Sequence, residues 1–157
     1  MQSHNNNSFS DYKYKEVLPR IPLNSKVILE IGCGDGLLGY EFKKKNPATR
    51  YIGIDSSGND NQIAIQRLDS VFFGDIEDYS ILLDKIPMVD CLILSNIFQY
   101  IQKPGRFLDS LSEILKEEAT IIILFSNSSN WIFLKNFFNG DNFYDNDLFN
   151  QNAFHKL

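Results

Sequence analysis

Five short apolar runs alternate along the chain with segments in which apolar residues recur every three or four positions. Short, nearly continuous apolar runs are typical of strands buried inside a parallel sheet, whereas the longer period is typical of amphipathic helices. The pattern therefore predicts five strands, over Lys26–Ile31, Tyr51–Asp55, Val71–Phe73, Val89–Ser95 and Ala119–Phe125.

Helices are predicted before and between these strands, where prolines and glycines mark several of their ends. They cover Asp11–Leu18, Gly36–Lys45, Gln62–Leu68, Tyr79–Lys85 and Pro104–Lys116. Strands that alternate with helices in this way indicate an α/β fold with a doubly wound, mainly parallel sheet. Ligands of such sheets bind beyond the carboxyl ends of the strands, so a functional site is expected there.

A chain of 157 residues is long enough for one domain with a substantial core. Residues 1–10 are rich in Asn and Ser, and we expect them to be disordered. Residues 11–157 then form a single domain. Its last part, residues 126–157, contains apolar residues such as Trp131, Leu134 and Phe137 at helical spacing, which predicts one further helix and a tail.

Composition and charge exclude several classes of protein. The net charge is −5 and no stripe of Lys or Arg is present, which argues against a nucleic-acid partner. No run approaches the roughly 18 apolar residues of a membrane-spanning helix, and the polar N-terminus lacks the apolar core of a signal peptide. Cys33 and Cys91 show no CxxC spacing, which favours a reducing compartment. We therefore expect a cytoplasmic protein that does not insert into a membrane.

Three glycines spaced two residues apart, Gly32, Gly34 and Gly36, directly follow the first predicted strand. Glycines at this place permit a tight turn and let a ligand approach the backbone closely. The helix that follows would direct its N-terminal amide groups at that ligand. The pattern predicts a nucleotide-type site at the mouth of the first strand.

Acidic residues lie within two residues of the end of each of the first three predicted strands: Glu30, Asp55 and Asp75. Their positions help to identify the nucleotide. Asp55 follows Gly36 at about the 20-residue offset of the acid that binds ribose hydroxyls in nucleotide-binding α/β folds. The alternative is that Asp55 only caps the turn after its strand. Glu30, one residue from the end of the first strand, would repel a pyrophosphate and suits a cationic group instead.

Taken together, Glu30-x-Gly32-x-Gly34-x-Gly36, Asp55 and Gly74-Asp75 resemble the class I S-adenosylmethionine-dependent methyltransferase family. The resemblance implies a Rossmann-like fold and S-adenosyl-L-methionine as cofactor. In that family the acid at Glu30 interacts, often through water, with the amino group of the cofactor. The acid at Asp55 holds the ribose, and the acid at Asp75 meets the adenine amine. The cofactor-binding residues implied here are Glu30, Gly32, Cys33, Gly34, Gly36, Asp55, Ser56, Asp75, Ile76, Ser95 and Asn96.

The stretch from Leu94 to Pro104 resembles small-molecule methyltransferases, which usually read Leu-Glu-His where this chain has Phe98, Gln99 and Tyr100. Because the chain departs from that pattern at all three positions, neither a histidine base nor a metal-holding acid carries over. Tyr100 is the candidate catalytic residue. It acts either as a hydrogen-bond donor or base, or as an aromatic cover over the cofactor.

The resemblance places residues 126–157 on the substrate side, and the family normally continues with a helix and two antiparallel strands. Because the chain ends at Leu157, we expect either a fragment or an additional domain or second copy that covers the edge of the fifth strand.

The predicted function is methyl transfer to oxygen or nitrogen of a small molecule. One alternative is a non-catalytic S-adenosylmethionine-binding or scaffold domain of a larger assembly. A third is an NAD-dependent oxidoreductase, which rests on Gly34-x-Gly36-x-x-Gly39 alone.

Overall fold

A computed structural model describes residues 9–56, 62–75 and 85–124 of the protein. Its strands are β1 (Val27–Ile31), β2 (Arg50–Asp55), β3 (Ser70–Phe73), β4 (Val89–Ser95) and β5 (Leu115–Leu124). Its α-helices are α1 (Phe9–Val17), α2 (Leu37–Lys45), α3 (Gln62–Arg67) and α5 (Pro104–Ser112), and two 3-10 turns are η1 (Leu18–Arg20) and η3 (Phe98–Tyr100).

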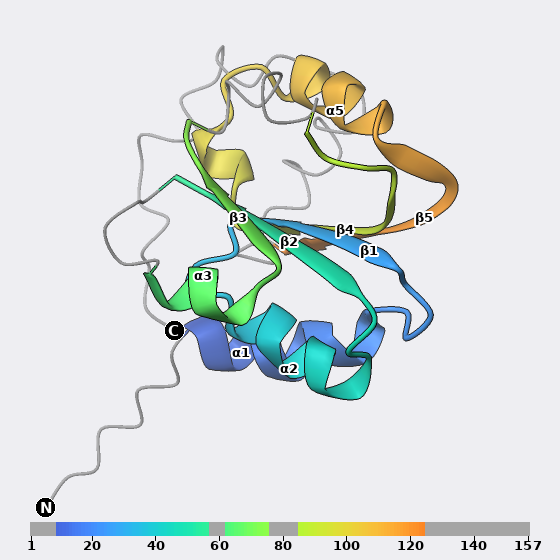
Figure 1. Cartoon of the computed structure of the whole chain (residues 1–157). Helices are drawn as coiled ribbons and strands as arrows, with labels where there is room; N and C mark the ends of the chain where they lie inside the picture. The colour runs from blue at the N-terminus through green and yellow to red at the C-terminus, as the bar shows by residue number, and fades with distance from the viewer. Residues whose placement is uncertain (1–8, 57–61, 76–84, 125–157) are drawn as a thin grey trace, which may run out of the picture.

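All five strands are parallel and lie in the order β3-β2-β1-β4-β5 (Figure 1). This arrangement confirms the predicted α/β class with a doubly wound sheet. The first strand, β1, is central in the sheet. The next two strands lie progressively farther out, to β3, and the chain then crosses back to β4 on the other side of β1. The direction of winding therefore reverses between β1 and β4, which is where ligands of such sheets bind.

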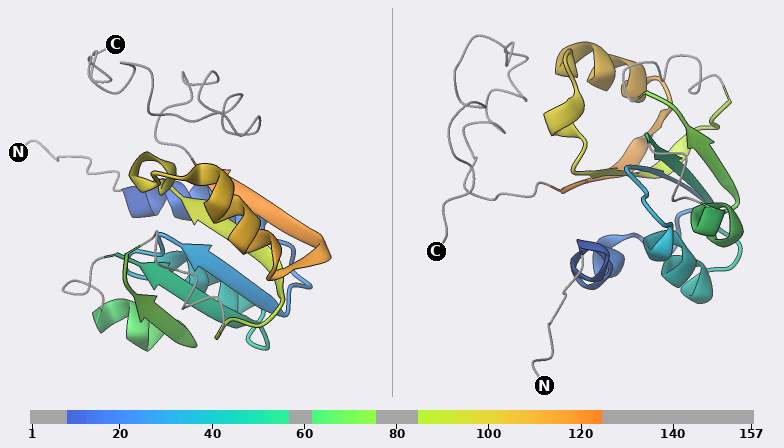
Figure 2. Two further views of the ribbon diagram at one scale, coloured as in Figure 1. Left: turned by 90° about the horizontal axis from the view of Figure 1, so that it is seen from above. Right: turned by 90° about the vertical axis from the view of Figure 1, so that its left-hand side faces the viewer.

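Helices cover both faces of the sheet. Figure 2 shows α1, α2 and α3 on one face and α5 on the other. Strand β1 alternates between the two layers, because Ile28 belongs to the apolar cluster under α1 and α2, whereas Leu29 and Ile31 belong to the cluster under α5. This alternation explains why the central strands read as continuous apolar runs: both of their faces are buried.

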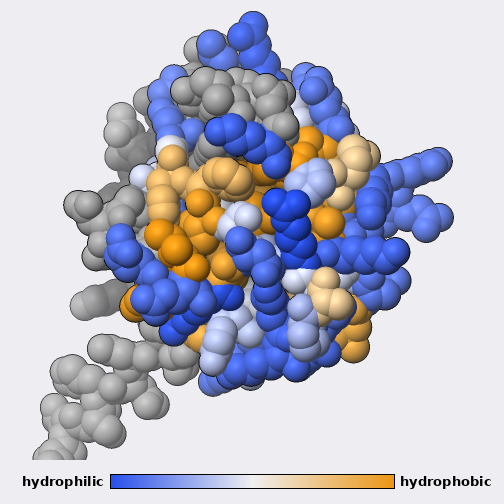
Figure 3. Space-filling model, in the orientation of Figure 1, coloured by the Kyte–Doolittle hydropathy of each residue, from blue (hydrophilic) through white to orange (hydrophobic). Residues whose placement is uncertain are grey.

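The edge strand β3 is less buried than the central strands, and all four of its residues are half-buried. Figure 3 shows apolar residues that reach the surface across the middle of the view, with hydrophilic residues around them. Within the described residues no helix is long and apolar enough to cross a membrane.

The predicted boundary between the last helix and the last strand is wrong. We expected the helix to continue to Lys116 and the strand to begin at Ala119, but α5 ends at Ser112 and β5 begins at Leu115. Ile114 and Leu115 continue the helical spacing, yet Leu115 pairs with Val89 of β4. The register between β4 and β5 shifts after this pair. The charged residues that follow Leu115 are exposed, which an edge strand tolerates, and β5 has only one strand partner among the described residues.

The other predicted elements that fall on described residues agree with the structure to within two residues. Strand β4 has the predicted bounds, and α1 begins at Phe9 rather than Asp11. The predicted helix over Tyr79–Lys85 lies almost entirely outside the described residues, as do the tail over residues 126–157, residues 1–8 and Ile76.

Helix α2 lies close to the sheet because it carries a glycine at the point of contact. A Cβ atom on the buried Gly39 would lie 2.6 Å from Cδ1 of Tyr51 and closer still to Cδ2 of Leu68. Gly105, near the start of α5, is exposed, and a Cβ atom there would have no neighbour within 4 Å. The two helical glycines therefore allow a matched test of packing.

We predict that Gly39→Ala destabilises the fold by about 1–3 kcal/mol, because overpacking a core outweighs the gain in helix propensity. Gly105→Ala should leave stability unchanged or raise it by up to about 1 kcal/mol, since the added methyl group meets no neighbour. Urea unfolding followed by circular dichroism measures both free energies. Equal effects of the two substitutions would contradict the close packing described for α2.

Candidate functional site

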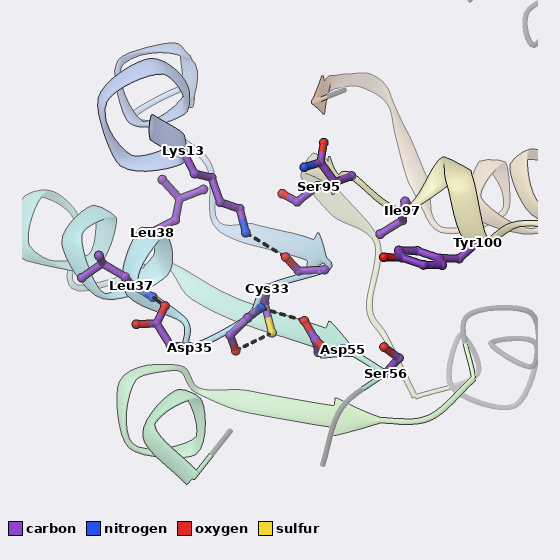
Figure 4. A pocket seen from close by; sticks show the side chains of 13 residues that line it. Lys13, Cys33, Asp35, Leu37, Leu38, Asp55, Ser56, Ser95, Ile97 and Tyr100 are labelled. Carbon is purple, nitrogen blue, oxygen red and sulfur yellow. Dashed lines mark hydrogen bonds between the residues drawn. The ribbon is translucent and has the colours of Figure 1, made fainter. Parts of the chain in front are cut away.

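A pocket of about 340 Å³ lies at the carboxyl ends of β1, β2 and β4 (Figure 4). Its volume falls within the roughly 300–1,000 Å³ of small-molecule sites. The residues that line it come from α1, the glycine turn, the start of α2, the end of β2, and the segment from the end of β4 to η3. They are Lys13, Gly32, Cys33, Gly34, Asp35, Leu37, Leu38, Asp55, Ser56, Ser95, Asn96, Ile97 and Tyr100. The pocket is thus at the place expected from the winding of the sheet.

The glycine turn after β1 has a backbone that only glycine adopts without strain. The φ angles of Gly32, Gly34 and Gly36 are 80°, 56° and 74°. A Cβ atom on Gly32 would collide with the carbonyl oxygen of Ser95, whereas one on Gly34 would have no neighbour within 4 Å. Gly32 therefore allows the close approach of β1 and β4, and Gly34 leaves room beside the backbone at the pocket wall.

Asp55 joins the end of β2 to this turn. Its Oδ2 atom accepts a hydrogen bond of 2.7 Å from the backbone N–H of Gly34 (Figure 4). Ser56, the next residue, is exposed and also lines the pocket. The carboxylate predicted from its offset to the glycines therefore lies beside them in space, in the wall of the pocket.

Glu30 lies beneath the pocket and is not among the residues that line it. Its side chain is fully buried, with Lys13 Nζ 2.7 Å from Oε1. The Tyr51 hydroxyl donates to Oε2 at 2.9 Å, and the Ser95 hydroxyl donates to Oε1 at 3.3 Å. Burial, followed by the charge of Glu30, raises the pKa of Tyr51 well above its ordinary value, so that this phenol keeps its proton and acts as a donor.

Five lining residues were not predicted from the sequence: Lys13, Asp35, Leu37, Leu38 and Ile97. Lys13 is the one of them that contacts Glu30. It comes from α1, and its Nζ also donates to the carbonyl oxygen of Gly32 at 2.7 Å. A signal for it exists in the sequence, because Lys13 stands four residues before Val17 and so shares its helix face. Both residues are buried.

Cys33 lines the pocket, and its burial favours the protonated thiol. Burial raises the pKa of Cys33 far above its ordinary value, and the negative charges of Glu30 and Asp55 raise it further. Because the thiolate is the reactive form of cysteine, Cys33 serves as a buried apolar contact in the wall of the pocket. Cys91 is buried in β4, and burial raises its pKa to about 12. Neither cysteine is in a disulfide.

The remaining predicted residues divide into two groups. Ser95, Asn96 and Tyr100 line the pocket, and Tyr100 is 65% exposed at its rim in η3. Gly36 caps α2 outside the lining, and Asp75 is exposed just after β3, also outside the lining.

Asn96 has the clearest sign of an absent polar partner. It adopts φ 52°, which is rare for a residue other than glycine. Within the described residues, its buried Oδ1 atom has no hydrogen-bond partner. An unsatisfied acceptor in a strained residue of a pocket wall fits a ligand that carries donors.

Solved methyltransferase structures share this fold. The plantazolicin methyltransferase BpumL in complex with SAH is 25% identical, with a TM-score of 0.55 over 73% of this chain and 42% of that chain. Coclaurine N-methyltransferase bound to N-methylheliamine and SAH is 16% identical, with a TM-score of 0.57 over 73% and 35%. The protein solved in complex with the Trm112 methyltransferase activator of Haloferax volcanii is 24% identical, with a TM-score of 0.58 over 69% and 49%.

The last two of these likenesses show the fold alone. The chain spans less than half the length of each of these three proteins. A search of curated proteins finds no match. The model of the family described as methyltransferase domain matches residues 29–121, which is more than half of the chain and includes the glycine turn and Asp55. The chain therefore belongs to the class I S-adenosylmethionine-dependent methyltransferase domain family.

Proposed function

We propose that this protein transfers a methyl group from S-adenosylmethionine to oxygen or nitrogen of a small molecule. The observation that carries the proposal is the 2.7 Å hydrogen bond between the Gly34 N–H and Asp55 Oδ2, which places a carboxylate beside an open glycine backbone in one pocket. BpumL and coclaurine N-methyltransferase were both solved with SAH, and their names give plantazolicin and coclaurine as the compounds on which they act.

Each pocket residue has a binding task in this proposal. Asp55 accepts hydrogen bonds from the ribose hydroxyls, and the glycine turn lets the nucleoside approach the backbone. The Oδ1 atom of Asn96, which has no partner among the described residues, accepts from a ligand donor. Asp75 follows β3, the strand beside β2, and we assign it with Ile76 to the adenine.

When bound, S-adenosylmethionine supplies a methyl group activated by a positively charged sulfur. The protein's own contribution is to hold the acceptor in line and to exclude water, and such positioning supplies roughly 7–11 kcal/mol in well-oriented reactions. We assign Tyr100 to covering the pocket rather than to proton transfer. Its position at the rim, 65% exposed, supports this assignment because an exposed ring becomes buried when a ligand fills the pocket.

A non-catalytic S-adenosylmethionine-binding domain of a larger assembly is the second candidate function. It is favoured by the departure from the Leu-Glu-His pattern at Phe98, Gln99 and Tyr100. Transfer of labelled methyl to a panel of phenols, sugars and amines separates the two, because a scaffold domain transfers none.

Location and partners are part of the same proposal. The two buried cysteines outside disulfides agree with a reducing compartment, and we assign the protein to the cytoplasm. We assign no nucleic-acid or membrane partner. An additional domain or a second copy is proposed to cover the outer edge of β5, the last strand in the described sheet.

We predict that Asp55→Asn weakens SAH binding about 10- to 100-fold, because charge-assisted hydrogen bonds contribute about 1.5–3 kcal/mol. The amide keeps an oxygen for the Gly34 N–H, so the fold is retained. Isothermal titration calorimetry measures the affinity, with NAD as a ligand control and Asp109→Asn, exposed on α5, as a matched variant. Unchanged SAH affinity in Asp55→Asn, or preferential NAD binding, would refute the cofactor assignment.

A second prediction concerns Tyr100. If its ring covers the cofactor, Tyr100→Phe should bind SAH within about twofold of the unmodified protein, since the apolar ring is retained. Tyr100→Ala should bind about tenfold more weakly, which corresponds to about 1.4 kcal/mol of lost apolar burial. The same calorimetric titration measures both. Equal losses in the Phe and Ala variants would show that the hydroxyl, not the ring, makes the contact.

A further inference from the structure

Lys13 of α1 lines the pocket and forms an ion pair with Glu30. Glu30 is the acid that the family resemblance assigns to the amino group of the cofactor. Lys13 Nζ lies 2.7 Å from Glu30 Oε1 and donates to the Gly32 carbonyl at 2.7 Å. The Lys13 side chain is 7% exposed and that of Glu30 is 0% exposed. Figure 4 shows Lys13 reaching from α1 toward the turn after β1, on the opposite side of the pocket from Asp55 and Ser56.

The carboxylate of Glu30 is already occupied by three groups of the protein itself. Besides Lys13 from α1, it accepts from the Tyr51 hydroxyl of β2 and the Ser95 hydroxyl of β4. Glu30 is fully buried and does not line the pocket, so an external ammonium group would contact it only if these groups moved aside. Displacing Lys13 would leave a buried charge without its partner, which is strongly unfavourable.

The pocket consequently presents a cation at this end, not an anion. Lys13 is the only positively charged residue among the described residues that line the pocket. Asp35 and Asp55 also line it, and Asp35 is paired with Arg67 outside the lining at 2.6 Å. A positive group in a partly enclosed pocket favours an anionic part of a ligand.

We propose that Lys13, held in place by Glu30, binds the carboxylate of the amino-acid end of the cofactor. Glu30 is then a positioning residue for Lys13 and does not bind the ammonium of the ligand directly. This inference rests on the proposed function, and it assigns Glu30 a role that differs from the one implied by the family resemblance.

Helix α1 is anchored well enough to hold Lys13 for this task. Val17, one turn after Lys13, is buried in the apolar cluster that also contains Leu38 and Phe42 of α2. Lys13 and Val17 lie on the same face of α1, so the packing of one fixes the direction of the other. The cation is therefore preorganised, which lowers the entropic cost of binding an anion.

Four ligands distinguish the contribution of the carboxylate to binding from that of the ammonium group at the amino-acid end of the cofactor. They are SAH, a decarboxylated analogue that keeps the ammonium, a deaminated analogue that keeps the carboxylate, and 5′-methylthioadenosine, which has neither. In calorimetric titrations of the unmodified protein, we expect the decarboxylated analogue to bind at least tenfold more weakly than SAH. The deaminated analogue should bind within about threefold of SAH. The reverse order would show that Glu30 binds the ammonium and would overturn the proposal.

Variants of Lys13 test whether the lysine causes this preference. Lys13→Met should bind SAH and the decarboxylated analogue equally, whereas Lys13→Arg should keep the preference for SAH. Lys15→Met, an exposed lysine on the same helix, is the matched control and should behave as the unmodified protein does. A tenfold preference for the carboxylate-bearing ligand that survives in Lys13→Met would overturn the proposal.

Lys13→Met leaves Glu30 buried without its ammonium partner, so its fold needs a separate test. The double variant Lys13→Met/Glu30→Gln removes both charges, and thermal melts followed by circular dichroism check that it is folded. It should also lose the preference for the carboxylate-bearing ligand. A folded double variant that retains the preference would show that the ion pair is only structural.

The nucleoside ligand distinguishes failure of this inference from failure of the proposed function. If 5′-methylthioadenosine and SAH bind but the carboxylate makes no difference, the role of Lys13 is wrong while the cofactor assignment stands. If none of the four ligands binds, the proposed function fails and the inference fails with it.

Discussion

The fully buried carboxylate of Glu30 is the interaction on which the arrangement around the pocket depends. A buried charge is stable only when it is paired and hydrogen-bonded, and its partners here come from three other elements: Lys13 of α1, Tyr51 of β2 and Ser95 of β4. The contacts that pair this one carboxylate therefore hold α1, β2 and β4 in place around the central strand β1. The pocket opens directly above this point, at the ends of the same strands.

The glycine turn is the second constraint, and it acts through shape rather than charge. Gly32 has a positive φ and lies so close to the carbonyl of Ser95 that no side chain fits between them. The turn can therefore leave β1 beside β4 without closing the space in front of it. Gly34 then brings its N–H to Asp55, which fixes the carboxylate at the pocket wall. Backbone geometry and one hydrogen bond together form this wall of the pocket.

Local patterns in the sequence were enough to predict the parallel sheet and the neighbourhood of the glycines and Asp55, because apolar runs and glycine spacing depend on nearby residues. The end of α5 was missed because Ile114 and Leu115 fit a helix by spacing, and only the pairing of Leu115 with Val89 makes the latter a strand residue. Lys13 was missed for a similar reason. Its partner Glu30 is distant in sequence. The one local signal, the spacing of Lys13 to Val17, is outweighed by the general tendency of lysine to be exposed.

The case of Glu30 shows why a motif predicts a residue type more safely than it predicts a role. An acid near the end of the first strand suggests a pocket that attracts cations, and the charge of Glu30 alone supports that interpretation. Once Lys13 pairs with the acid, the charged group that lines this end of the pocket is the ammonium rather than the carboxylate. The same four-element network that stabilises the buried acid thus determines which end of an amino acid the pocket can bind. Stability and specificity at this site have one physical cause.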